Sequence, residues 1–134
     1  VGAYAQTGRR GAPIVAGWIP YIDEATNNPD EFGYIPANSV PGPVNYIFTV
    51  GLGGCTIVAV DRGVKGIYFY HEPTKASWAN LPVYPNGNNV LVRAQPAMAG
   101  FAMIRRSGAA PNGWEILVQD ANGLMSGGVT AFPV

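Results

Sequence analysis

The chain contains a single cysteine and a single histidine, and both lie in one short part of the sequence. Cys55 follows the glycine-rich run Thr49-Val50-Gly51-Leu52-Gly53-Gly54, and His71 ends the run Ile67-Tyr68-Phe69-Tyr70-His71. Two β-rich segments separated by a polar, glycine-containing turn are typical of a hairpin. If Gly63 is the centre of this turn, Cys55 lies directly opposite His71, with their Cβ atoms ~4.5–5.5 Å apart.

A cysteine beside a histidine has a definite chemistry. A free thiol has a pKa of about 8.5 and is mostly protonated at neutral pH, but an adjacent imidazole converts it to a nucleophilic thiolate. The same register places Ile57 opposite Phe69 and Ala59 opposite Ile67. Cys55 and His71 would then lie at one end of the apolar face that these residues form. The alternatives are an inert buried cysteine and a histidine that only caps a strand, and a one-residue slip would separate the two side chains.

The glycines before Cys55 have their own interpretation. Gly51, Gly53 and Gly54 let the backbone turn sharply and leave room for a substrate. The backbone amides of Gly54 and Cys55 would then be available to stabilise a developing oxyanion. A simple turn between two strands is the alternative. A phosphate-binding loop is disfavoured, because no lysine follows and no helical pattern begins there.

Other polar residues near this segment are weaker candidates. Strand alternation places Glu72 on the face opposite to His71, where we expect it to be solvated. We expect Asp61 to serve the turn, and Arg105 and Arg106 to lie at an exposed strand end. None of these residues is expected to take part in chemistry.

Composition excludes several classes of function. The 134 residues include eight basic and eight acidic side chains, and only 12% are charged, so the clustered lysine and arginine of a nucleic-acid or anionic-membrane binder are missing. One cysteine cannot form an intramolecular disulfide, and one cysteine with one histidine cannot make a zinc site of the usual kind. We expect no metal, no cofactor and no membrane span.

Turn signals and short β-rich segments predict a mainly β fold. Asn-Gly occurs three times, at 86–87, 112–113 and 122–123, and favours turns between antiparallel strands. Six strands are expected, at 44–50, 55–60, 66–71, 89–95, 101–106 and 114–119. They predict a β-sandwich or barrel of mostly antiparallel strands. Only two short segments, 23–28 and 74–79, are candidates for helix.

Residues 1–134 are interpreted as one domain. Residues 1–43 hold half of the twelve prolines, so we expect an irregular segment that covers the sheets, with a substrate-docking arm as the alternative. No internal repeat is visible.

The segment 46–72 resembles a family of enzymes. Leu52-Gly53-Gly54-Cys55 is similar to the Leu-x-Gly-Cys motif of the cytotoxic necrotizing factor catalytic domain and of the Burkholderia lethal factor. Thr49, six residues before the cysteine, and a histidine some fifteen residues after it resemble the chemoreceptor glutamine deamidases. The resemblance implies a β-sandwich with Cys55 as nucleophile, His71 as acid and base, and Thr49 as the group that orients His71. The Cys-to-His spacing varies among these families, so the histidine is the less specific assignment.

The resemblance further implies a protein glutamine deamidase that acts through a thioester. Its partner would be a protein with a target glutamine, such as a Rho-type GTPase of a host. We expect a monomeric toxin or effector domain, secreted or injected to act in a target-cell cytosol, with the bacterial cytoplasm as the alternative. Two other functions remain open: a non-enzymatic β-sandwich binding module, and another Cys–His acyl-transfer enzyme such as a transglutaminase or peptidase.

Overall fold

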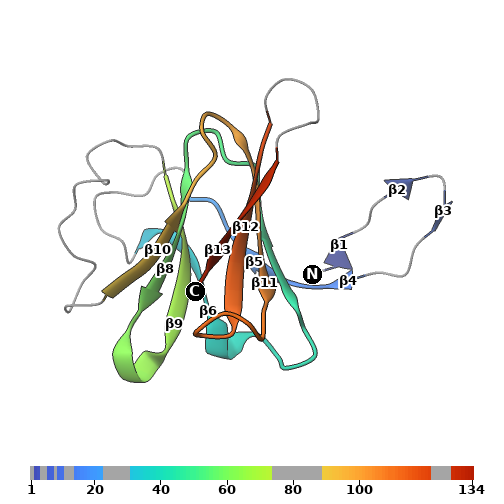
Figure 1. Cartoon of the computed structure of the whole chain (residues 1–134). Coiled ribbons are helices and arrows are strands. Elements are labelled where there is room, and N and C mark those ends of the chain that lie inside the picture. Colours follow the sequence, from blue (N-terminus) through green and yellow to red (C-terminus); the bar gives the residue numbers. More distant parts are fainter. Residues whose placement is uncertain are drawn as a thin grey trace.

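A computed structural model describes residues 2–3, 6–7, 9–10, 14–22, 31–73, 89–121 and 128–134, with side chains described from residue 14 onward. Two sheets lie face to face (Figure 1). The helical structure in the described ranges consists of short 3-10 turns, which include η2 (Ala37–Ser39) and η3 (Gly63–Lys65). The fold is therefore mainly β, as the sequence predicts.

The first sheet has five strands in the order β13-β12-β11-β7-β5. Their bounds are Val129–Pro133, Trp114–Asp120, Gly100–Arg106, Tyr46–Thr49 and Gly17–Ile19. The second sheet has four strands in the order β10-β8-β9-β6, with bounds Asn89–Ala94, Thr56–Asp61, Ile67–Glu72 and Gly33–Pro36. All neighbouring strands in both sheets are antiparallel except β5 and β7. Two small pairs, β1 (Gly2–Ala3) with β4 (Ile14–Val15) and β2 (Gln6–Thr7) with β3 (Arg9–Arg10), complete the described strands.

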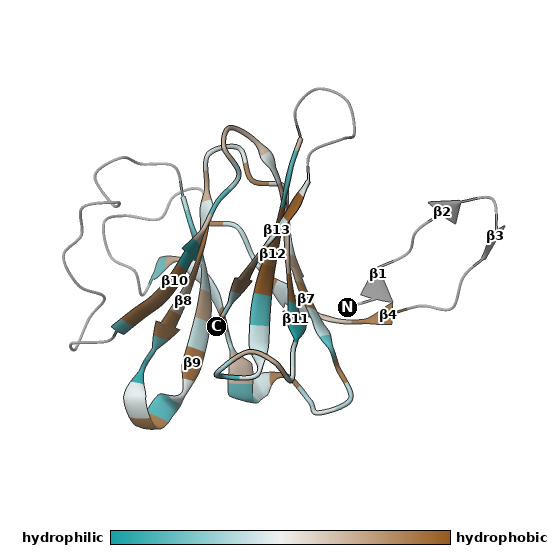
Figure 2. Cartoon of the chain, viewed as in Figure 1, coloured by the Kyte–Doolittle hydropathy of each residue, from teal (hydrophilic) through white to brown (hydrophobic). Residues whose placement is uncertain are grey.

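The core lies between the two sheets. Alternate residues of the five-stranded sheet, such as Ile47, Ile104 and Ile116, pack against Ile57 and Phe69 of the four-stranded sheet, and all five are buried. Figure 2 shows that β8 is largely hydrophobic, whereas β12 has both hydrophobic and polar residues. In β12, buried and partly buried positions alternate from Trp114 to Val118. Period-two alternation on facing sheets is the pattern of a β-sandwich.

All six predicted strands are present, but residues 1–43 differ from the expectation. This segment is not purely irregular cover, because it supplies β5 and β6, one edge strand of each sheet. Both strands are short and pair with distant parts of the chain, which local sequence patterns do not indicate. Asn112-Gly113 lies between β11 and β12, with Gly113 at φ +79°. The other two Asn-Gly pairs and both helix candidates lie outside the described residues.

The hairpin between β8 and β9 differs from the prediction by two residues. Its last paired residues are Asp61 and Ile67, so five residues form the turn rather than a tight turn centred on Gly63. η3 lies in this turn, Gly63 and Gly66 adopt φ +61° and +83°, and Asp61 accepts a hydrogen bond from the Gly63 amide. His71 is therefore opposite Ile57, not Cys55.

Candidate active site

One end of the sandwich gathers the residues that the sequence singles out. It is the uppermost end in Figure 1, where β7 ends at Thr49, β8 begins at Thr56 and β9 ends at Glu72. The loop 50–55 crosses from the five-stranded sheet to the four-stranded sheet at this end. Cys55 thus lies at the start of one strand, His71 near the end of its neighbour, and Thr49 on the facing sheet.

Cys55 and His71 share a face despite the corrected register. A shift of two residues preserves strand alternation, so Cys55 points to the same side of the sheet as Ile57, the residue opposite His71. Cys55 and His71 are therefore diagonal neighbours rather than a directly opposed pair, and diagonal neighbours lie ~7–8 Å apart between backbones, within reach of longer side chains. Cys55 is not part of a disulfide and is 6% exposed, within the buried core.

Thr49 contacts His71 across the two sheets. The Thr49 hydroxyl oxygen lies 2.7 Å from Nδ1 of His71, and the same hydroxyl donates a 3.0 Å hydrogen bond to the Ile19 carbonyl. The carbonyl can only accept, and the hydroxyl has one proton. Both contacts are satisfied when Nδ1 carries hydrogen and donates to Thr49. This arrangement leaves Nε2 of a neutral imidazole with its lone pair.

The His71 side chain is fully buried. Its exposed fraction is 0%, and the Tyr21 ring lies over it with centroids 5.0 Å apart. The segment that carries Tyr21 is pressed against β6, because a Cβ on Gly33 would lie 1.6 Å from the Pro20 carbonyl oxygen. Burial lowers the pKa of His71 from its ordinary value of 6.5 to about 4. His71 is therefore neutral at physiological pH, and its Nε2 has no hydrogen-bond partner among the described residues.

The glycine-rich loop has a defined conformation. Leu52 forms two backbone hydrogen bonds with Gly100, of 2.8 and 2.9 Å, which fix the loop to the start of β11. Gly54 has φ +87°, a conformation that residues with a side chain rarely adopt. Gly53 and Gly54 are exposed, whereas Cys55 directly after them is buried. The loop therefore places exposed backbone directly before the buried thiol.

A polar network supports the site from the outer face of the four-stranded sheet. Glu72 is opposite Thr56 on this face, as strand alternation predicts, but it is 4% exposed rather than solvated. One Arg93 nitrogen lies 2.8 Å from both Glu72 carboxylate oxygens, and Thr56 donates a 2.9 Å hydrogen bond to Gln95. These contacts tie β8, β9 and the end of β10 together beside Cys55 and His71.

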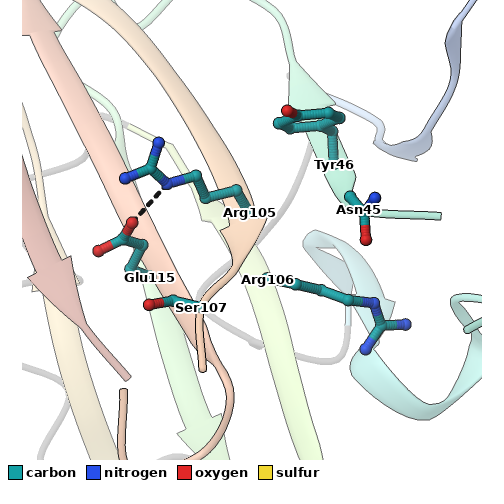
Figure 3. Close-up of a pocket in the computed structure, with 6 residues that line it drawn as sticks. All are labelled: Asn45, Tyr46, Arg105, Arg106, Ser107 and Glu115. Carbon is teal, nitrogen blue, oxygen red and sulfur yellow. Dashed lines mark hydrogen bonds and ion pairs between the residues drawn. The ribbon is translucent and has the colours of Figure 1, made fainter. Parts of the chain in front are cut away.

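An open pocket of about 310 Å³ lies at the opposite end of β7 and is lined by the six residues drawn in Figure 3. Arg105 pairs with Glu115, whereas Arg106 points away to the carbonyls of Val40, Pro41 and Val44. Its guanidinium also lies 4.3 Å from the Trp114 ring. These bonds within the protein give both arginines structural roles, and the pocket holds neither the thiol nor the imidazole.

Three contributors to this site have no signal in the sequence: the Ile19 carbonyl, the Tyr21 ring and the close approach at Gly33. All depend on where β5 and β6 join the sheets. In the described ranges, no group of three or more His, Cys, Asp or Glu side chains is placed to hold a metal ion. Nor does any helix there have the length and apolar character needed to cross a membrane. No protein-family model matches the chain, and no curated protein matches it.

Proposed function

We propose that this domain is a cysteine-dependent protein glutamine deamidase, with Cys55 as nucleophile and His71 as general acid and base. The observation that carries the proposal is the state of His71: a fully buried, neutral imidazole whose Nδ1 is bonded to Thr49 and whose Nε2 has no hydrogen-bond partner among the described residues. A buried polar atom without a partner is costly and uncommon, and a catalytic role is one of the reasons for which it is retained. Nε2 has the lone pair that a general base needs, on the face that it shares with the only thiol of the chain.

The reaction runs in two halves. The Cys55 sulfur attacks the side-chain carbonyl carbon of a glutamine while the thiol proton passes to Nε2 of His71. The carbon–nitrogen bond then breaks, and His71 gives the proton to the leaving ammonia, which leaves a thioester. Water attacks the thioester and gives a proton to His71, and the departing sulfur takes that proton back. The products are a glutamate side chain and free Cys55, so no cofactor is consumed.

The low pKa of His71 changes the mechanism from the one expected from the sequence. A preformed thiolate–imidazolium pair requires a charged imidazole, but burial keeps His71 neutral above about pH 4. His71 therefore removes the thiol proton during the attack instead of holding a thiolate in advance. The Thr49 oxygen stabilises the imidazolium that forms transiently, because it already accepts a hydrogen bond from Nδ1.

The glycine loop completes the proposed site. Backbone amides near Gly54 would stabilise the negative charge that develops on the amide oxygen of the substrate. Gly53 belongs to the same exposed turn and gives the substrate space, since a Cβ added there would meet no atom within 4 Å.

The test uses an unfolded protein substrate, reduced and carboxymethylated casein, because its glutamines are accessible. Wild-type protein should release ammonia and convert glutamine to glutamate, as located by peptide mass spectrometry. Cys55→Ala should do neither, while keeping the circular dichroism spectrum of the wild type. Cleavage of the casein backbone by the wild type, or equal conversion by Cys55→Ala, would contradict the proposal.

A further inference from the structure

Resting on the function proposed above, we infer that three exposed apolar side chains beside the glycine loop bind the target protein. These residues, called here the apolar rim, are Val50, Met98 and Phe101. Their exposed fractions are 40%, 79% and 60%. The inferred ligand is a polypeptide segment with an apolar side chain within about four residues of the target glutamine.

The apolar rim is continuous with the loop that carries the thiol. Val50 directly follows Thr49, and a Cβ on Gly51 would lie 3.5 Å from the Phe101 ring. Gly100, next to Phe101, forms the paired backbone hydrogen bonds with Leu52. Cys55 is four positions after Gly51, and an extended chain spans at most ~3.3–3.6 Å per residue. The Phe101 ring and the thiol are thus both within reach of one short substrate segment.

The apolar rim is held in place rather than left to collapse onto the core. The Ala97 amide donates a 2.7 Å hydrogen bond to the Asp120 carboxylate, and the Ala121 amide donates to the Ala99 carbonyl at 2.9 Å. These bonds fix the turn that carries Met98. Gly100 permits a close approach, because a Cβ there would lie 2.0 Å from the Gln119 carbonyl oxygen. A backbone that is already fixed loses less conformational entropy when a partner binds.

Charge indicates the nature of the partner. The segments 46–60 and 94–104, which contain the loop and the apolar rim, have no charged residue. The nearest carboxylate described above, Asp120, is bonded to the turn itself, and Glu72 is paired with Arg93. The carboxylate group of free glutamine would find no cationic side chain in these two segments. A glutamine within a polypeptide, flanked by an apolar residue, suits this surface better.

Binding energy supports the same conclusion. A primary carboxamide is small and well solvated, so it contributes little affinity by itself. Enzymes draw the energy for orienting such a group from remote parts of the substrate. Burial of apolar surface on Met98 and Phe101 would supply that energy.

The experiment measures kcat/KM for blocked peptides that differ only near the glutamine. One has glycine and serine at every flanking position, and each of three others has a single leucine, placed two, three or four residues from the glutamine. The wild type should prefer the best leucine peptide by roughly tenfold, the scale of a small apolar contact in specificity. Met98→Ser/Phe101→Ser should bring this ratio close to one. Met98→Ser alone is the second variant, should the double variant not fold.

Val64→Ser is the matched control, because Val64 is fully exposed but lies in the β8–β9 turn at the other end of the sandwich. It should keep the wild-type ratio. A wild-type ratio near one, or an undiminished ratio in the double variant, would overturn the inference while leaving the deamidase itself intact. Absence of turnover with every peptide and with casein would instead refute the proposed function, and the inference with it.

Discussion

The neutral, buried state of His71 makes a quantitative prediction about stability. In the unfolded chain the imidazole titrates near its ordinary pKa of 6.5, and in the folded protein near 4. Between these values the unfolded state binds a proton that the folded state does not. Each unit of difference corresponds to about 1.4 kcal/mol. The contribution of His71 to the free energy of unfolding should therefore not change with pH above about pH 7. It should fall by about 3 kcal/mol as the pH drops from about 7.5 to 4.

The assay is urea unfolding of wild type and His71→Asn at a series of pH values. The Asn side-chain amide can donate to Thr49 in place of Nδ1 but binds no proton, so subtraction of the two curves removes the contribution of the carboxylates. Because His71 is the only histidine in the chain, its imidazole protons also give a single set of NMR resonances. These resonances should report a folded-state pKa well below 6.5.

The opposite sign would refute the reasoning. If His71 were held as an imidazolium beside a thiolate, its folded pKa would be raised. Stability from His71 would then be greatest at acidic pH and would be lost as the pH rises through that raised pKa. Titration at 6.5, with no difference between wild type and His71→Asn, would mean that water reaches the imidazole.

Thr49→Val should lower kcat/KM by about 10- to 100-fold, because it leaves the buried Nδ1 donor of His71 unsatisfied at a cost of about 1–3 kcal/mol. Thr49→Ser keeps the hydroxyl and should have most of the wild-type rate. Equal rates for the two variants would exclude an orienting role for the hydroxyl. Gly54→Ala should strain the loop by about 1–3 kcal/mol and lower activity more than thermal stability. Gly108 is an exposed glycine at the far end of the sandwich, and Gly108→Ala should leave activity and stability unchanged. Full activity of Gly54→Ala would argue against the proposed oxyanion site. Arg93→Met should lower the free energy of unfolding in urea by about 1–3 kcal/mol, because it removes the guanidinium from the buried Glu72 carboxylate. The double variant Arg93→Met/Glu72→Gln should recover part of this loss.

The strands that could be predicted from the sequence are those with strong local patterns. β8, β11 and β12 have β-branched or alternating residues bounded by glycine and asparagine, so their positions are correct to within one or two residues. β5 and β6 could not be predicted, because each has only a few residues and is stabilised by pairing with a distant strand.

The candidate site was predictable in its residues but not in its geometry. The juxtaposition of Thr49 with His71 was expected only by resemblance, and the 2.7 Å contact is present. The direct opposition of Cys55 and His71 was wrong, because the five-residue turn after Asp61 shifts the register by two. Because the shift is two residues, Cys55 and His71 still lie on the same face of the sheet. Burial of His71 under Tyr21 was beyond prediction, since it depends on how the chain leaves β5.

The most direct test of the central claim is to trap the covalent intermediate. Wild-type protein is mixed with a glutamine peptide that it deamidates, quenched in acid within the first turnover, and measured as intact protein and as digested peptides. We expect an adduct equal to the peptide minus ammonia, attached to Cys55, that disappears at later times and never forms on Cys55→Ala. Ammonia release without any adduct on Cys55, or an adduct on another residue, would contradict the proposed role of Cys55.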